Sequence, residues 1–362
     1  MSGSIAALAF NDLALELFAL QFEHNSHYRR FCQGRQLSPA GLRRWEQIPA
    51  IPTPAFKEWE LSCLPAEERS VVFFSSGTTE HQPSRHFHNH RSLEIYEASL
   101  LGWFGVHLLP NDPKSFSLRA LALTPSPAQA PHSSLVHMFE TVQRRLGFTK
   151  FSFTGAKTEE GIWVIDCQAI IALLQEAVLA KEPVLLLGTA FSFVHLLDHM
   201  AQRNLTLRLP AGSRVMETGG YKGRSRALSK PELHSFIASK LGIPRSGIVC
   251  EYGMSELSSQ AYDRDCWSPS QAGRETLFSN VSHQEARCFR FPSWVRVQIV
   301  SPESGQPVTE AQTGLIRVFD LANVYSVMAV QTDDLAVRRG DGFELIGRAE
   351  LAEARGCSLM AQ

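Results

Sequence analysis

Short apolar runs alternate with longer helical patterns through the middle of the chain, and this alternation constrains the fold more than any other feature. An apolar run of about four to eight residues is typical of a buried strand, and a longer run with a period near 3.6 is typical of a helix. The strands predicted in this way cover residues 118–125, 183–190, 213–220 and 246–256. The predicted helices cover residues 92–109, 166–182, 191–204 and 230–242.

Beyond Phe291 the apolar pattern changes to a period of two, which indicates half-buried strands. These strands are predicted at residues 293–301, 314–320, 325–330 and 342–348. Strands that alternate with helices and then give way to a run of strands predict the α/β class, here as a multilayer body with a β-rich C-terminal part.

The N-terminal part predicts a helix, an extended connector and a strand. Apolar residues at helical spacing predict a helix from about Asn11, with that residue as its N-cap; they are Leu13, Leu17, Phe18 and Leu20. Repeated proline in residues 48–56 (IPAIPTPAF) forbids a helix there and favours an extended path. Residues 70–74 (SVVFF) are predicted to form a buried strand.

Composition limits the classes of function. The chain has 362 residues and 44% hydrophobic content, which is enough for one large or two ordinary domains. A net charge of -1 argues against a dedicated binder of nucleic acid or of an acidic membrane surface. The longest apolar run, residues 184–197, is too short to span a bilayer. Scattered cysteines without a C-x-x-C pair and the absence of a basic N-terminal region leave the cytoplasm as the default expectation.

The segment that follows the predicted strand at 70–74 is rich in hydroxyl groups. It reads SSGTTE from Ser75 to Glu80, and Arg85 lies a few residues further on. Backbone N–H groups of a glycine-containing turn, together with Ser and Thr hydroxyls, can cradle an anion, and an arginine can add a bidentate phosphate contact. The segment lacks the Walker pattern. Taken alone, it slightly favours an ordinary surface turn.

Several motifs in sequence order carry a family resemblance. They are IPAIPTPAFKE (48–58), FFSSGTTE (73–80), METGGYKGRS (216–225), EYGMSE (251–256), QTDD (331–334), GRAELAEARG (347–356) and RGCSL (355–359). This set resembles the adenylate-forming superfamily and, more narrowly, its acyl-protein synthetase branch, which neighbours the phenylacetate–CoA ligases. The resemblance covers nearly the whole chain. It implies a large domain over residues 1–345 and a short remnant over 346–362, with the usual small mobile C-terminal domain truncated or absent.

The resemblance implies ATP and Mg²⁺ as cofactors, because these enzymes make an acyl-adenylate. In that reaction a carboxylate attacks the α-phosphate of ATP and expels pyrophosphate, so the site must hold both reactants in line. The residues that the resemblance places on the triphosphate are Ser75, Ser76, Gly77, Thr78, Thr79 and Arg85. Arg85 stands where relatives usually carry Lys, and Glu80 stands where they often have Gly, so this loop departs from the family pattern.

The same resemblance assigns the nucleoside contacts. Tyr252 would stack on adenine, and Gly219 and Gly220 would lie against the purine, where a side chain would obstruct. Asp334 would accept both ribose hydroxyls, and Arg348 would reach the ribose or the α-phosphate. The glycines on their own would equally indicate a tight turn, and the arginine a residue of a β-turn.

In the same YGMSE motif, Ser255 would meet a phosphate oxygen and Glu256 would bind Mg²⁺, a hard cation that prefers carboxylate oxygen. We therefore expect Glu256 and Arg348 to act in catalysis. In isolation, the motif would more simply indicate a strand end with a capping serine and a solvated glutamate.

Cys357, in the tail segment RGCSL, resembles the acyl-accepting cysteine of the acyl-protein synthetase branch. There the thiol takes the acyl group from the adenylate and passes it to a reductase-like protein partner. A thiolate that attacks a mixed anhydride gives a thioester, and Arg355 nearby would lower the thiol pKa. The alternative is an incidental cysteine in the tail. No lysine follows Lys240, so we expect adenylation to proceed without the usual C-terminal-domain lysine.

Three readings of function remain open on these residues. The leading one is activation of a carboxylic acid, fatty or otherwise apolar, followed by transfer to the protein cysteine. The second is an acyl-CoA ligase that resembles phenylacetate–CoA ligase, and the third is a nucleotide-binding partner protein with reduced catalysis. His86, His88 and His90 would share one face of an extended segment, but surface or supporting histidines are favoured there over a metal site.

Overall fold

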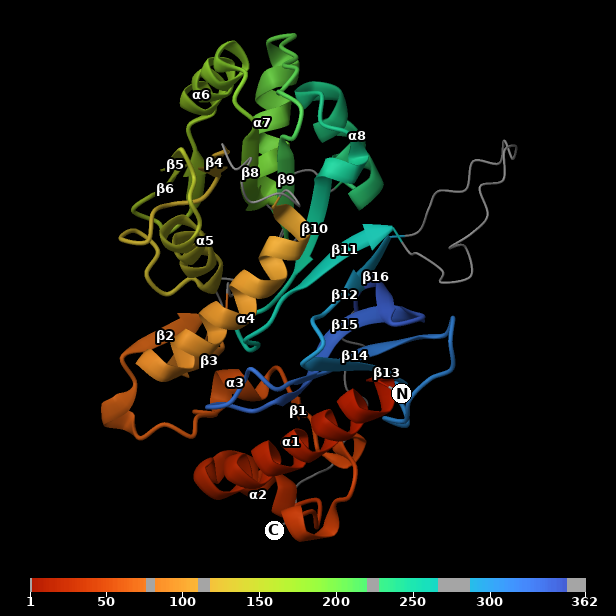
Figure 1. Cartoon of the computed structure of the whole chain (residues 1–362). Helices are drawn as coiled ribbons and strands as arrows, with labels where there is room; N and C mark the ends of the chain where they lie inside the picture. The colour runs from red at the N-terminus through yellow and green to blue at the C-terminus, as the bar shows by residue number, and fades with distance from the viewer. Residues whose placement is uncertain (1, 76–81, 110–117, 220–227, 266–286, 350–362) are drawn as a thin grey trace, which may run out of the picture.

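The computed structural model of the chain describes residues 2–75, 82–109, 118–219, 228–265 and 287–349 (Figure 1). Within these ranges the dominant feature is a mixed sheet of 12 strands. Its parallel half contains, from the edge inward, β5 (Lys150–Phe153), β4 (Arg119–Ala122), β8 (Val184–Thr189), β9 (Arg214–Thr218) and β10 (Ile248–Tyr252).

The sheet changes to antiparallel pairing immediately after β10. The order continues through β11 (Ala261–Asp265), β12 (Arg287–Arg290), β16 (Gly342–Arg348), β15 (Ala329–Arg339), β14 (Thr313–Asp320) and β13 (Val295–Val300). The short β1 (Ile51–Pro52) adds to β15 in parallel, so the proline-rich connector is extended at these two residues as predicted, whereas its last two residues begin the short helix α3 (Ala55–Glu58). The strand that ends at Tyr252 therefore stands at the junction of the two halves.

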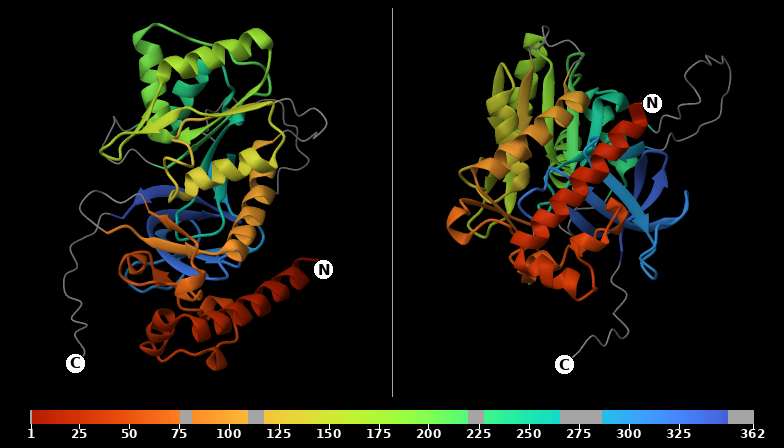
Figure 2. Two further views of the ribbon diagram at one scale, coloured as in Figure 1. Left: turned by 90° about the vertical axis from the view of Figure 1, so that its left-hand side faces the viewer. Right: turned by 60° about the horizontal axis from the view of Figure 1, so that its bottom comes forward.

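Helices cover both faces of the parallel half (Figures 1 and 2). On one face lie α6 (Cys167–Ala180), α7 (Ala190–Gln202) and α8 (Lys230–Leu241), and on the other lie α4 (His90–Leu108) and α5 (Ser134–Arg145). Within β8, Leu186 packs with the first group, whereas Leu185 and Leu187 pack with the second. Burial of both faces explains why this strand is apolar without interruption.

The α/β class and the alternating elements predicted for the middle of the chain are confirmed by this arrangement. Among the C-terminal strands, the one predicted at 325–330 begins only at Ala329. The predicted domain boundary at 345/346 falls inside β16, and the division into two domains remains a proposal.

The N-terminal helix differs from its prediction. It spans Ser2–His24 (α1), so Asn11 lies inside it, and the Asn11 side chain instead accepts a 3.0 Å hydrogen bond from the backbone N–H of Trp45. The face that packs on the antiparallel half carries Phe10, Ala14 and Phe18, which are four residues apart. Leu13 is 55% exposed and Leu20 is 41% exposed, so two of the four residues used for the prediction lie on the outer face.

The strand predicted at 70–74 exists but is not buried as a whole. It forms β2 (Val71–Phe74), which pairs only with β3 (Arg85–His88) in a separate hairpin, and Phe73 is its one buried residue. The other described helices and strands are α2 (Ser26–Gln33), α3 (Ala55–Glu58), β6 (Gly155–Lys157) and β7 (Trp163–Ile165). Short 3₁₀ turns cover Pro39–Gly41, Trp45–Gln47, Ala66–Glu68 and Arg245–Gly247.

Candidate active site

Tyr252 and Asp334 meet at the junction of the two halves of the sheet. The Tyr252 phenol, at the end of β10, donates a 2.8 Å hydrogen bond to Asp334 Oδ2 on β15. The tyrosine ring is packed among Phe289, Phe291 and Phe343, with centroids 5.5 to 6.2 Å away. Burial raises the pKa of Tyr252 well above its ordinary value, so the phenol keeps its proton and remains a donor.

Arg348 is the cross-strand partner of Asp334 in the β15–β16 pair. Burial raises the pKa of Asp334, while the Tyr252 hydrogen bond and the positive charge of Arg348 act in the opposite direction. The backbone at Asp334 is fixed as well, because its N–H donates to Thr332 Oγ1, which in turn donates to the Ile316 carbonyl. Tyr252, Asp334 and Arg348, predicted from three separate motifs, are thus brought together.

The turn after Tyr252 is buried and held by two residues from the antiparallel half. Ser255 Oγ donates to Glu256 Oε2 at 3.1 Å, and both residues are less than a tenth exposed. The Glu256 carbonyl accepts a hydrogen bond from Asn323, and the Ser259 hydroxyl donates to Asp320. Burial raises the pKa of Asp320 to about 6, against the opposing effect of its hydrogen bonds. The serine and the glutamate therefore lie together on a fixed turn.

His86 links this turn to the strand that follows the hydroxyl-rich segment. Its Nδ1 lies 2.6 Å from the Ser255 carbonyl oxygen. A carbonyl can only accept, so Nδ1 carries the proton. Burial lowers the pKa of His86 to about 4, and the ring is neutral at pH 7. At the same end of β3, Ser75 and Ser84 are hydrogen-bonded to each other, so the described residues on either side of the hydroxyl-rich segment are anchored beside the Ser255 turn.

The three histidines do not share one environment. His86 and His88 are buried, with ring centroids 4.2 Å apart, and His90 is exposed. Of the two expected alternatives, surface or supporting histidines, the first two are therefore not surface residues, and His86 has a supporting contact with the Ser255 turn. His88 shares a hydrogen bond with Ser92, and its ring packs against Phe73. In the part of the chain that the structure describes, no group of three or more His, Cys, Asp or Glu side chains is placed to hold a metal ion.

The described part of the structure includes the predicted site residues Arg85 and Gly219 but not several others. Arg85 lies at the start of β3, and its guanidinium is 3.3 Å from Glu60. Gly219 follows β9 with a φ of 72°, a conformation that favours glycine, and a side chain there would meet open space. The predicted site residues outside the described ranges are Ser76, Gly77, Thr78, Thr79, Gly220 and Cys357.

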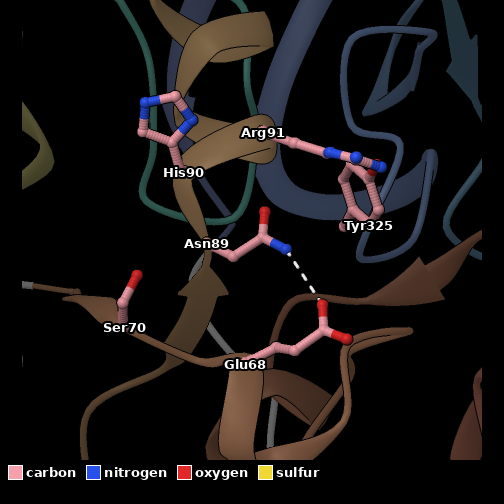
Figure 3. A pocket seen from close by; sticks show the side chains of 6 residues that line it. All are labelled: Glu68, Ser70, Asn89, His90, Arg91 and Tyr325. Carbon is pink, nitrogen blue, oxygen red and sulfur yellow. Dashed lines mark hydrogen bonds between the residues drawn. The ribbon is translucent and has the colours of Figure 1, made fainter.

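A solvent-accessible cavity of about 590 Å³ lies at the opposite end of the β2–β3 hairpin from the hydroxyl-rich segment (Figure 3). It is lined by Glu68, Ser70, Asn89, His90, Arg91 and Tyr325. Among these side chains, Asn89 donates a 3.3 Å hydrogen bond to Glu68. None of the predicted nucleotide residues lines this cavity, so we do not place the nucleotide there.

Sequence reasoning missed the residues that hold the site turn from a distance. Asn323 and Asp320 carry no motif, and their contacts with the turn span more than 60 residues. Gln21 of α1 is fully buried and donates 2.7 Å to the Asn323 carbonyl, which ties the N-terminal helix to the same turn. Gln21 could have been found from the sequence, because it is a polar residue on the packed face of a helix. A buried amide there needs hydrogen-bond partners from another part of the chain.

The sheet, with its parallel and antiparallel halves joined at β10, has the α/β fold of the adenylate-forming ligases. A solved structure of 2-hydroxyisobutyryl-CoA ligase, in an open conformation with 2-HIB-AMP and CoA, matches 94% of this chain and 69% of its own, with a TM-score of 0.66 and 16% identity. The same enzyme in its thioesterification state gives a TM-score of 0.66 with 17% identity, over 95% of this chain and 68% of its own.

The chain belongs to the acyl-protein synthetase (LuxE) family, whose model matches residues 6–362. The long-chain-fatty-acid–luciferin-component ligase of Aliivibrio fischeri is 22% identical over 358 residues, covering 96% of this chain and 86% of the relative. The ligase of the same name from Vibrio harveyi is 21% identical over 350 residues, covering 94% and 84%. The chain is therefore an acid ligase. None of its described helices is both long enough and apolar enough to cross a membrane.

Proposed function

We propose that this chain activates a carboxylic acid with Mg·ATP, releases pyrophosphate, and transfers the acyl group from acyl-AMP to the thiol of Cys357. The observation that carries the proposal is the meeting of Tyr252, Asp334 and Arg348 at the junction of the two sheet halves. Membership of the acyl-protein synthetase family and the adenylate-forming fold support acyl activation by this route.

The nucleotide would bind against the Tyr252–Asp334 pair. The tyrosine hydroxyl occupies one oxygen of Asp334, and among the described residues the other oxygen accepts no hydrogen bond. A carboxylate held in this way can accept from ribose hydroxyls, and its fixed backbone reduces the ordering that binding requires. Arg348, across from it on β16, can add a charge-assisted contact to the ribose or the α-phosphate.

The metal would bind at the turn that carries Ser255 and Glu256. A carboxylate and a hydroxyl side by side on a fixed, buried turn supply hard oxygen ligands, and the two side chains are already hydrogen-bonded to each other. We expect Glu256 to be the protein ligand. When bound, Mg²⁺ would neutralise charge on the phosphate oxygens. His86, through the Ser255 carbonyl, would keep this turn aligned with the hydroxyl-rich segment.

The acid would be a fatty or other apolar carboxylic acid. The curated relatives are named for a long-chain fatty acid and a luciferin component, and we carry the apolar acid over to this chain as part of the proposal. The protein that finally receives the acyl group would be a reductase-like partner.

The transfer step moves the acyl group from an anhydride to a thioester. The Cys357 thiol loses its proton to solvent, the sulfur attacks the acyl carbon, a C–S bond forms, and the bond between that carbon and the AMP oxygen breaks. AMP leaves with the bonding electron pair, so no oxidant or reductant is needed. This step converts one activated acyl group into another, and the release of AMP leaves the nucleotide site free for a new molecule of ATP.

Mass spectrometry of the intact protein tests this function. After incubation with ATP, Mg²⁺ and an apolar acid, we expect one acyl adduct on Cys357, which is absent in Cys357→Ser although pyrophosphate exchange continues. Cys63→Ser is the matched control, because burial raises the pKa of the Cys63 thiol to about 12 and keeps it unreactive. An adduct that survives in Cys357→Ser would contradict the acceptor role, as would acyl-CoA release without any protein adduct.

A further inference from the structure

Glu217 and Lys230 flank the segment that contains Gly219, and they form an ion pair whose carboxylate is buried and whose ammonium group is partly exposed. Glu217 lies on β9, two residues before Gly219, and Lys230 is the first residue of α8. Lys230 Nζ is 3.2 Å from Glu217 Oε1; the glutamate side chain is 0% exposed and the lysine side chain 38%. The pair therefore holds the end of β9 against the start of α8.

The buried carboxylate is charged despite its surroundings. Burial opposes ionisation, but Lys230 and His234 hold the pKa of Glu217 down at about 2. His234, also on α8 and fully packed, lies 3.1 Å from the same oxygen, and the second oxygen has no hydrogen-bond partner among the residues that the structure describes. A buried ion pair is seldom a net source of stability, because desolvation offsets the attraction. Its presence is better explained by the geometry that it imposes.

Lys230 also reaches two other strands of the site. Its Nζ lies 2.5 Å from Cys250 Sγ on β10 and 5.7 Å from the centre of the Phe289 ring on β12. Cys250 precedes Tyr252 by two residues, and Phe289 packs against the Tyr252 ring at 5.9 Å. The Lys230 ammonium group thus contacts β9, β10 and β12. On β9 and β10 the contacted residue lies two positions before Gly219 or Tyr252, and on β12 the contacted ring packs against the Tyr252 ring.

We propose that Glu217 and Lys230 are positioning residues that fix the spacing between Gly219 and Tyr252, the two sides of the purine site. Neither side chain touches the nucleotide in this role. The inference rests on the proposed function, since it presumes that a purine binds between Gly219 and Tyr252. It goes further by assigning the alignment of that site to an ion pair to which the sequence analysis gave no role.

Calorimetric titration of ATP into the full chain tests this role. We expect Lys230→Met to weaken ATP binding about tenfold, because Gly219 and Tyr252 would no longer be held at the right spacing. A loss of about tenfold is the size of effect that the loss of one hydrogen bond produces. Lys230→Arg keeps the charge and should bind ATP within about twofold of the unchanged chain. Lys240→Met, at the other end of the same helix, is the matched control and should bind as the unchanged chain does.

The double variant Glu217→Gln/Lys230→Met guards against a variant that simply fails to fold. It removes both charges together, so no carboxylate is left buried without a partner. In pyrophosphate exchange it should raise KM for ATP about tenfold, matching the affinity loss, and leave KM for the acid unchanged. ATP binding by the double variant equal to that of the unchanged chain would overturn the positioning role. If the unchanged chain binds no ATP, the proposed function fails, and the positioning role fails with it.

Discussion

Tyr252 and Asp334 are 82 residues apart in the sequence, and a 2.8 Å hydrogen bond joins the phenol of one to the carboxylate of the other. The bond crosses from the last parallel strand to the antiparallel half of the sheet. It fixes one candidate adenine contact relative to one candidate ribose contact before any nucleotide binds. Preorganisation of this kind lowers the entropy that binding must overcome.

Replacing Asp334 by Asn should weaken ATP binding about tenfold or more, because an amide accepts fewer hydrogen bonds from the ribose hydroxyls than a carboxylate does. The neighbouring Asp333→Asn is the matched control, since side chains that are adjacent on a strand point to opposite faces. Calorimetry of ATP binding to both variants makes the measurement. Equal losses in the two variants would show that the Asp334 side chain has no special place in the site.

His86 should make folding stability depend on pH. Burial lowers its pKa from 6.5 in the unfolded chain to about 4. Between pH 6.5 and about 4, His86 is therefore protonated in the unfolded chain and neutral in the folded chain. The contribution of neutral His86 is complete above pH 6.5 and is lost as the pH falls toward 4. The full loss amounts to about 3 kcal/mol.

Comparison with His86→Asn isolates this effect, because the amide can still donate to the Ser255 carbonyl but does not titrate. Urea unfolding at pH 7 and at pH 4 should show the unchanged chain losing about 3 kcal/mol relative to the variant. Other buried groups titrate in both chains and cancel in the difference. Parallel pH profiles for the two chains would contradict a neutral, buried His86.

The packed face of α1 can be tested by two substitutions on the same helix. Phe18 is fully buried, so Phe18→Ala should lower the free energy of unfolding by about 3–5 kcal/mol. Leu13 is 55% exposed, so Leu13→Ala should change it by less than about 0.5 kcal/mol. Chemical denaturation of both variants measures the difference, and a larger loss at Leu13 would reverse the assignment of the two faces.

The local pattern of the sequence predicted the central strands and helices correctly. It did not predict which face of α1 is packed or that β2 lies outside the main sheet. The apolar run at 184–189 predicted β8 because a strand buried on both faces needs no polar residue. The outward face of α1 carries leucines, and the inward face carries a glutamine, Gln21, so periodicity alone placed two of its four residues, Leu13 and Leu20, on the wrong face. The hairpin strand β2 resembles a core strand in composition, although only Phe73 is buried.

The candidate site likewise contains some residues that the sequence predicted and others that it did not. The resemblance of the motifs placed Tyr252, Asp334 and Arg348 in one site, and the structure brings these three together. Asp320, Asn323 and Lys230 lie outside every quoted motif, and Glu217 lies in one that gave it no role, because their roles arise from contacts between distant elements. Sequence patterns of period two or 3.6 describe one element at a time and cannot identify such contacts.

The central claim is that this chain forms an acyl-adenylate, and acid-dependent exchange of labelled pyrophosphate into ATP tests it most directly. With a panel of fatty and aromatic acids, we predict exchange that requires Mg²⁺ and at least one apolar acid, and that falls sharply in Asp334→Asn. Absence of exchange with every acid, in a chain that is folded and binds ATP, would contradict the claim.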